Sequence, residues 1–105
     1  MCNRISRDAA QAFLRFRPFR RSNTEVVVTS PSCAVLKLYG NVIAENLASG
    51  GIRMTMAGWG SMTTAARLNA VMATLGLAAR WRRRNWMWWC GDEVLEDTND
   101  VVEVR

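Results

Sequence analysis

The chain has 105 residues, a mass of 11.8 kDa and a formal net charge of +5, and 50% of its residues are hydrophobic. This length supports a single domain over residues 1–105, because a chain of this size builds one core and not two. The longest uncharged run, residues 26–36, contains polar residues and a proline, so no stretch approaches the ~20 apolar residues that span a bilayer. We therefore expect a soluble or peripheral protein.

Charge is divided unevenly along the chain. Residues 1–84 contain 13 of the 14 basic residues and carry a net charge of +10, whereas residues 91–105 carry −5. A basic body of this kind is typical of proteins that bind nucleic acid or an acidic partner. A charged surface that only keeps a small domain soluble has the same composition, so composition alone leaves both interpretations open.

The residue types argue against catalysis and metal binding. The chain has no histidine, which is the usual base and zinc ligand at neutral pH. Asp8, Glu25 and Glu45 are the acids of residues 1–84, and they lie on separate predicted elements without paired-carboxylate spacing. The three cysteines are far apart and form no CxxC motif, which favours a reducing cytoplasm. We expect a non-catalytic protein with no cofactor and no metal.

Residues 6–17, within a basic N-terminal segment of residues 1–22, are predicted to form a short helix. Ser6 is the expected N-cap, and Pro18 ends the helical pattern. The helix is cationic and amphipathic, as membrane-surface helices are. Only three apolar residues larger than alanine lie on its apolar face, which favours packing on the domain and makes a membrane the weaker alternative.

Residues 24–90 are predicted to form the core of an α+β domain, an antiparallel sheet with one main amphipathic helix in a ββαβ-like order. Strands are expected where β-branched or alternating apolar residues occur, at 24–30, 33–39, 42–46 and 52–57. The dipeptide Gly40-Asn41 is a two-residue turn signal, so the second and third strands should form a hairpin.

The main helix is predicted over residues 64–75, with Thr63 as its N-cap and Gly76 as its C-terminal stop. Apolar residues recur there at i, i+3, i+4 and i+7, which gives one stripe that can pack on the sheet. The stripe consists of Leu68, Val71, Met72 and Leu75, and Arg67 and Asn69 fall off it.

Four arginines and four tryptophans occur within residues 80–89. Residues 77–81 and 85–90 are predicted to be two strands or one bent strand, with the bend at the three arginines of residues 82–84. Such a stretch is either a core strand beside a charged turn or a surface that binds a polyanion.

Burial or exposure of the tryptophan rings distinguishes these two interpretations. In a strand, Trp86 and Trp88 would point one way and Trp89 the other, so both faces would be apolar. Core packing is the favoured interpretation for Trp86 and Trp88, whereas burial and exposure stay equally open for Trp81 and Trp89. Exposed rings beside arginines can stack on bases while the arginines bind phosphates. The candidate binding residues are Arg80, Trp81, Arg82, Arg83, Arg84 and Trp89.

The last segment, residues 91–105, is an acidic tail that also contains valines and a leucine. We expect a final edge strand at residues 101–104. Because opposite charges attract at short range, the tail is predicted to lie on the arginines of the body and to cover part of any polyanion site.

Three segments resemble a pattern found in short bacteriophage-encoded proteins of unassigned function. These segments are YGNVIAE from Tyr39, AGWGSMTTAARLNAVM from Ala57 and NWMWW from Asn85. The shared order is Gly-Trp, then Thr-Thr-x-x-Arg-Leu-Asn-Ala at the head of a helix, then Asn-Trp-x-Trp in a closing strand, over residues 34–90. The resemblance implies a phage or prophage origin and a ββαβ-like unit, and it supplies no site.

A phage origin favours two roles for a small non-catalytic protein. The leading prediction is nucleic-acid binding in the cytoplasm of a bacterial host through the arginines and tryptophans of residues 80–89. The alternative is an antagonist of a host defence system, such as an anti-CRISPR inhibitor, that acts by protein–protein contact, because interface hot spots favour the same residue types.

Overall fold

The computed structural model describes residues 4–58 and 60–104 and has the expected α+β class. Trp59 of the Gly-Trp step, residues 1–3 of the basic segment and Arg105 of the tail lie outside the described residues. The elements follow in the order α1 (Arg4–Leu14), β1 (Phe19–Arg21), β2 (Thr24–Ser30), β3 (Cys33–Leu38), β4 (Asn41–Leu47), β5 (Gly51–Thr55), α2 (Met62–Thr74), β6 (Trp81–Arg84), β7 (Met87–Cys90), β8 (Glu93–Val94) and β9 (Val101–Glu103).

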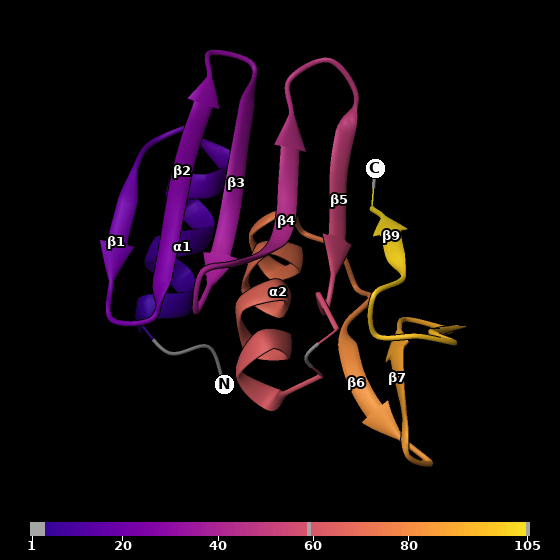
Figure 1. Cartoon of the computed structure of the whole chain (residues 1–105). Helices are drawn as coiled ribbons and strands as arrows, with labels where there is room; N and C mark the ends of the chain where they lie inside the picture. The colour runs from indigo at the N-terminus through magenta and orange to yellow at the C-terminus, as the bar shows by residue number, and fades with distance from the viewer. Residues whose placement is uncertain (1–3, 59, 105) are drawn as a thin grey trace.

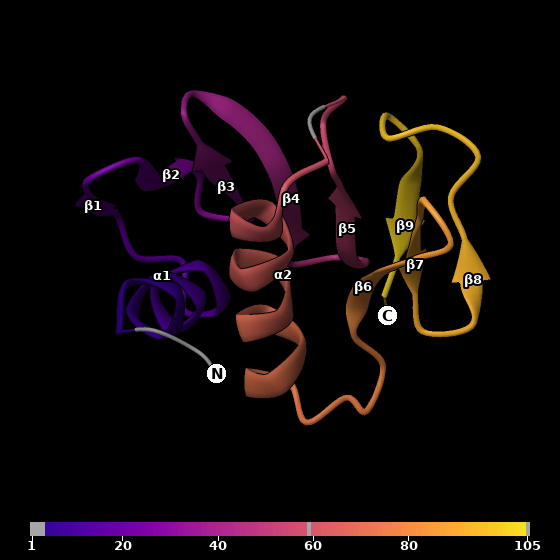
Figure 2. The same ribbon diagram turned by 90° about the horizontal axis from the view of Figure 1, so that it is seen from below.

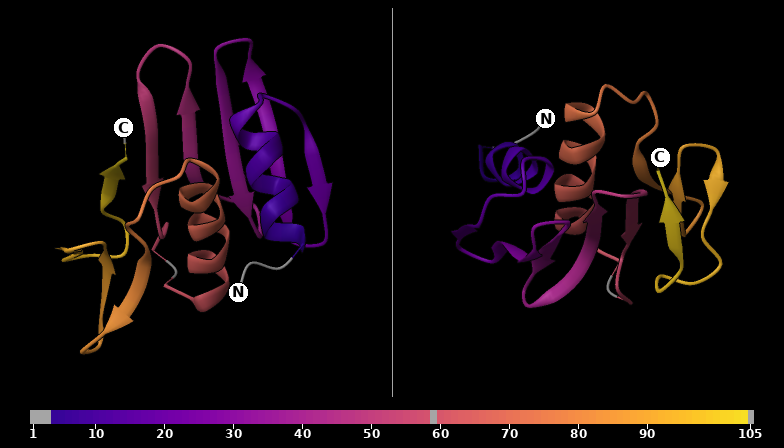
Figure 3. Two further views of the ribbon diagram at one scale, coloured as in Figure 1. Left: turned by 180° about the vertical axis from the view of Figure 1, so that it is seen from behind. Right: turned by 90° about the horizontal axis from the view of Figure 1, so that it is seen from above.

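Six strands form an antiparallel sheet in the order β1-β2-β3-β4-β5-β9 (Figure 1). Both helices cover the same face of this sheet (Figure 3). The side chains of β5 show how the alternating pattern produces this layering, because Ile52 and Met54 are buried and Arg53 between them is exposed. The four strands predicted between residues 24 and 57 are confirmed to within two residues.

The expected final strand is confirmed as β9, which closes the sheet beside β5. Its register pairs Arg53 with Glu103 and Met54 with Val102. The side chains of Arg53 and Glu103 also form an exposed ion pair of 3.5 Å. Among the described residues of the tail, Glu103 is the one that forms an ion pair with the rest of the chain. The end of the tail is thus held along the edge of the sheet at β5.

Helix α2 begins two residues before the predicted start, because Ser61 and not Thr63 is its N-cap. Ser61 is extended, with φ −134° and ψ 158°, and its hydroxyl accepts a hydrogen bond of 3.1 Å from the amide of Thr64. The predicted stop at Gly76 is confirmed, since this residue has φ 78° and donates its amide to Ala73 while Leu77 donates to Met72. This is the pair of hydrogen bonds that ends many helices.

The predicted stripe of α2 faces the core, where Leu68, Val71 and Met72 are at most 1% exposed. Arg67, outside the stripe, is nevertheless 5% exposed. The reason is that α2 packs against α1 as well as the sheet, so a second side of the helix is buried (Figures 2 and 3).

The Arg67 guanidinium joins three elements through neutral acceptors. It donates to Ser6 Oγ of α1 at 2.6 Å, to Thr24 Oγ1 of β2 at 2.8 Å and to Asn23 Oδ1 at 3.3 Å. Burial lowers the pKa of the Arg67 guanidinium, and the neighbouring Tyr39 phenol partly opposes this effect. Arg67 therefore holds α1, α2 and β2 together.

The N-terminal segment differs from the prediction in two respects. Ser6 is not the N-cap, because α1 begins by Arg4 and the Ser6 hydroxyl is buried against Arg67. The helix also ends at Leu14 and not at residue 17, and the basic residues after Pro18 form β1, which adds an edge strand to β2 and pairs Arg20 with Glu25.

The last part of the chain forms a second, three-stranded sheet in the order β6-β7-β8, and β6 and β7 lie below β5 and β9 in the view of Figure 1. Asn69 of α2 fastens this sheet to the body through the backbone of Trp81. Its Oδ1 accepts from the Trp81 amide at 2.6 Å, and its Nδ2 donates to the Trp81 carbonyl at 2.9 Å. The Asn69 side chain thus occupies the edge of β6 in the way a neighbouring strand would.

Gly60 allows the second sheet to approach the start of α2. A Cβ atom at Gly60 would lie 2.3 Å from Nε1 and 2.9 Å from Cδ1 of Trp88. We therefore expect Gly60→Ala to lower the free energy of unfolding by about 1–3 kcal/mol in urea denaturation, because overpacking displaces a large ring. Gly50→Ala is the matched control, since its Cβ meets nothing within 4 Å. Equal stability of the two variants would contradict this close packing.

Candidate nucleic-acid interface

The β6–β7 hairpin, residues 81–90, carries most of the predicted site. Its strands pair Trp81 with Cys90 and Arg84 with Met87, so the connection is the two-residue turn Asn85-Trp86. Both turn residues have positive φ, 54° and 66°, as in the type I′ turn that suits a twisted hairpin. The predicted bend at residues 82–84 is therefore wrong, because these arginines lie within β6.

The structure changes the candidate roles of Trp86 and Trp81 and confirms that of Trp88. Trp86 belongs to the turn and is 89% exposed, so its assignment to the core is wrong. Trp81 is only 2% exposed, because Asn69 fixes its backbone against α2 and the ring enters the core, and this removes it from the candidate surface. Trp88 is 6% exposed, as predicted for a core residue.

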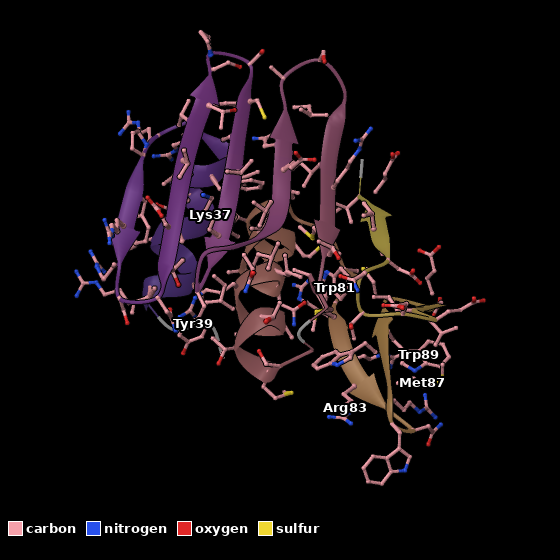
Figure 4. All side chains as sticks on the ribbon, in the orientation of Figure 1. Lys37, Tyr39, Trp81, Arg83, Met87 and Trp89 are labelled. Atoms are coloured by element: carbon pink, nitrogen blue, oxygen red, sulfur yellow. The ribbon has the colours of Figure 1, made fainter. Side chains whose placement is uncertain are left out.

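Cross-strand pairing sorts the remaining side chains onto two faces of the hairpin, because paired residues point to the same side. Trp81, Trp88 and Cys90 share the inner face with Arg83, which is exposed near the tip of the hairpin. Burial raises the pKa of the Cys90 thiol to about 11, with a further contribution from Glu93. The outer face continues onto β8 and contains Arg82, Arg84, Met87, Trp89 and Val94. Figure 4 shows Trp89 and Met87 on this side and Trp81 on the other.

The outer face combines cations with partly exposed apolar surface. The guanidinium of Arg82 lies 5.9 Å from the centroid of the Trp89 ring, and Trp89 Nε1 donates to the carbonyl of Arg84 at 3.3 Å. Trp89 is half-buried, while Met87 is 41% exposed. The Trp89 ring is thus held by one hydrogen bond and has one guanidinium, that of Arg82, beside it.

The tip of the hairpin presents a second cation–aromatic pair. The guanidinium of Arg83 lies 5.8 Å from the centroid of the exposed Trp86 ring. Arg80, by contrast, turns back on the chain, where its Nη1 donates to the carbonyl of Ala79 at 2.8 Å and also to that of Leu77. Of the six predicted residues, the hairpin thus places Arg82, Arg84 and Trp89 on its outer face and Arg83 on the opposite face beside the tip, and it adds Met87 to the outer face and Trp86 at the tip.

The hairpin arginines have no carboxylate partner among the described residues. The ion pairs there join Asp8 to Arg4 and to Arg21, and Arg53 to Glu103. The predicted covering of the basic site by the acidic tail is therefore wrong for residues 91–104. The tail runs along β7 and then β5, and its pairing through backbone hydrogen bonds leaves the arginine side chains exposed.

Two general features of the described residues bear on the kind of site. No group of three or more histidine, cysteine, aspartate or glutamate side chains within residues 4–58 and 60–104 is placed to hold a metal ion. No helix in the same residues has the length and apolar character needed to cross a membrane.

Comparison with protein families places the chain among bacteriophage proteins. The family model described as the Kyanoviridae Gp96 protein matches residues 2–103, so the chain belongs to this family. The phage origin implied by the sequence pattern is thereby confirmed. No curated protein and no solved structure matches the chain.

Proposed function

We propose that the protein is a non-catalytic phage protein that binds single-stranded nucleic acid through the β6–β7 hairpin. The observation that carries the proposal is the exposure of Arg82, Arg83 and Arg84, without carboxylate partners in the described chain, beside the 89% exposed ring of Trp86. Unpaired bases stack on exposed aromatic rings, and arginines bind the phosphates between them.

The two cation–aromatic pairs suggest a division of roles along one strand. Arg82 and Arg84 flank Trp89 on the outer face, so one base would stack there while the two guanidinium groups bind adjacent phosphates. Trp86 at the tip would stack a second base, with Arg83 beside it. A duplex offers no exposed base faces to these rings, which is why a single strand is preferred.

The proposal is tested by fluorescence anisotropy with labelled oligothymidine and oligouridine at increasing salt. The logarithm of the binding constant should fall linearly with the logarithm of the salt concentration, with a slope of about −0.7 for each phosphate contacted. A duplex with the same total number of phosphates serves as the control and should bind more weakly. Absence of binding to every single strand at low salt would reject the proposal.

Trp86→Gly is expected to weaken binding about tenfold, because one stacked base contributes about 1–3 kcal/mol. The substitution turns the hairpin loop into Asn-Gly, the preferred type I′ sequence, so the hairpin itself should be kept or stabilised. Trp86→Phe keeps a ring and is expected to retain most of the affinity. Urea unfolding confirms the fold of both variants, and unchanged affinity of Trp86→Gly would exclude stacking at the tip.

A host-protein target is the second candidate, favoured by the same exposed tryptophan and arginines, which are the residue types enriched in interface hot spots. In this alternative the protein would block a host defence complex. Co-purification from a bacterial lysate with and without nuclease separates the two. A stoichiometric protein that survives nuclease treatment supports the alternative, whereas loss of all bound material supports nucleic acid.

A further inference from the structure

A groove of about 470 Å³ lies between the β3–β4 hairpin and the start of α2. Its volume is in the range of sites that bury a small organic group. Leu38, Ile43 and Met56 form an apolar floor, and each is at most 3% exposed. Tyr39 stands at the rim with 68% of its surface exposed, and Asn41 and Thr63 add an amide and a hydroxyl. This combination suits a flat ring with polar edges.

Tyr39 occupies an unfavourable backbone conformation. It forms the two-residue turn of the β3–β4 hairpin with Gly40, and their φ values are 52° and 80°. The predicted turn Gly40-Asn41 is therefore displaced by one residue, because Asn41 pairs with Leu38. A bulky side chain with positive φ is uncommon and costs stability, and such residues are often kept for function.

The same backbone conformation occurs in the β6–β7 hairpin, where Trp86 has φ 66°. Each of the two hairpins thus holds an exposed aromatic ring in a left-handed turn position. The two turns lie at the same end of the molecule, with the start of α2 between them (Figure 1). Tyr39 and Arg83, both labelled in Figure 4, mark the two sides of this end.

The charge near the groove suits an anionic ligand chain. None of the described residues that line the groove is charged. The nearby guanidinium of Arg67 is held by neutral oxygen atoms of Ser6, Thr24 and Asn23 and has no carboxylate partner in the described chain. This guanidinium interacts electrostatically with Tyr39 at the rim, so the positive charge beside the groove favours an anionic ligand over a cationic one.

We propose that the groove beside Tyr39 binds an unpaired base of the same nucleic-acid strand that the β6–β7 hairpin binds. The inference rests on the proposed function and extends its binding site across one end of the molecule. Tyr39 stacks on the base, the apolar floor excludes water, and Asn41 and Thr63 face its polar edge. The strand then runs from Trp86 past the start of α2 to Tyr39.

The test compares wild type, Tyr39→Asn and Tyr39→Phe with labelled oligothymidines of about 4 and about 15 nucleotides, which span the site sizes of small single-strand binding domains. Tyr39→Asn removes the ring and creates Asn-Gly, the favoured turn, so the fold is preserved. Affinity of this variant for the longer strand should fall about fivefold or more, while affinity for the shorter strand, which the hairpin alone accommodates, should stay within about twofold. Tyr39→Phe should retain the affinity for both.

The outcomes separate this inference from the proposed function. If Tyr39→Asn binds the longer strand as wild type does while Trp86→Gly binds it weakly, the groove is not part of the site and the hairpin proposal stands. If Tyr39→Phe loses as much affinity as Tyr39→Asn, the ring does not stack and the inference is overturned. If wild type binds no single strand, both the hairpin proposal and the groove proposal fail.

Discussion

Replacement of Arg82, Arg83 and Arg84 together by glutamine is expected to weaken the binding of a single strand about 100-fold at about 0.1 M salt. Each phosphate contact releases counterions and contributes a slope of about −0.7 in log affinity against log salt, so three contacts account for about two orders of magnitude between 0.1 M and 1 M salt. The slope measured by anisotropy should therefore become shallower by about 2. The three side chains are exposed, so the fold should remain intact.

The matched control replaces Arg15, Arg17 and Arg20 by glutamine. These arginines are also exposed, and they lie at the opposite edge of the molecule, around β1 (Figure 1). The net charge changes by the same amount in both variants, so long-range attraction is reduced equally. Equal losses of affinity and equal slopes would show that binding depends on net charge alone and would contradict a site on the hairpin.

The sheet could be predicted because its strands have one buried and one exposed side. Alternating residues such as those of β5 indicate which side faces the core, and this signal does not depend on distant contacts. The helix α2 was recognisable for the same reason from its stripe and from Gly76. Its N-cap was missed because Ser61 and Thr63 are both good caps, and the choice depends on the path of the chain from β5.

The candidate site was predicted in part because its arginines are clustered in the sequence, and clustering survives any local rearrangement. The orientation of the tryptophans was not predicted correctly, because it depends on the position of one turn. A turn at residues 82–84 sends Trp86 into a strand, whereas the observed turn at Asn85-Trp86 leaves it at the tip. Asn85 was the available signal, since asparagine tolerates positive φ, but tryptophan rarely follows it in such a turn.

The polar residues of the Arg-Leu-Asn segment show a second limit of sequence patterns. Leu68 faces the sheet as its period predicts, but Arg67 and Asn69 on either side of it contact α1 and β6, elements from opposite ends of the chain. A stripe identifies one buried face of a helix and cannot reveal that the neighbouring faces are also covered. Asn69 positions the hairpin relative to the core, whereas Arg67 holds α1 and β2 against α2.

Arg67→Met is expected to lower the free energy of unfolding by about 3 kcal/mol, because three hydrogen bonds from a charged donor are lost while most of the side-chain volume is kept. Thr24, which is 1% exposed, would lose the donor that Arg67 Nε supplies at 2.8 Å. Urea denaturation measures the change, and Arg7→Met on the exposed side of α1 is the control, with an expected effect within about 0.5 kcal/mol. Similar stability of the two variants would show that apolar packing alone joins α1, α2 and β2, and that the buried guanidinium is not required to hold them together.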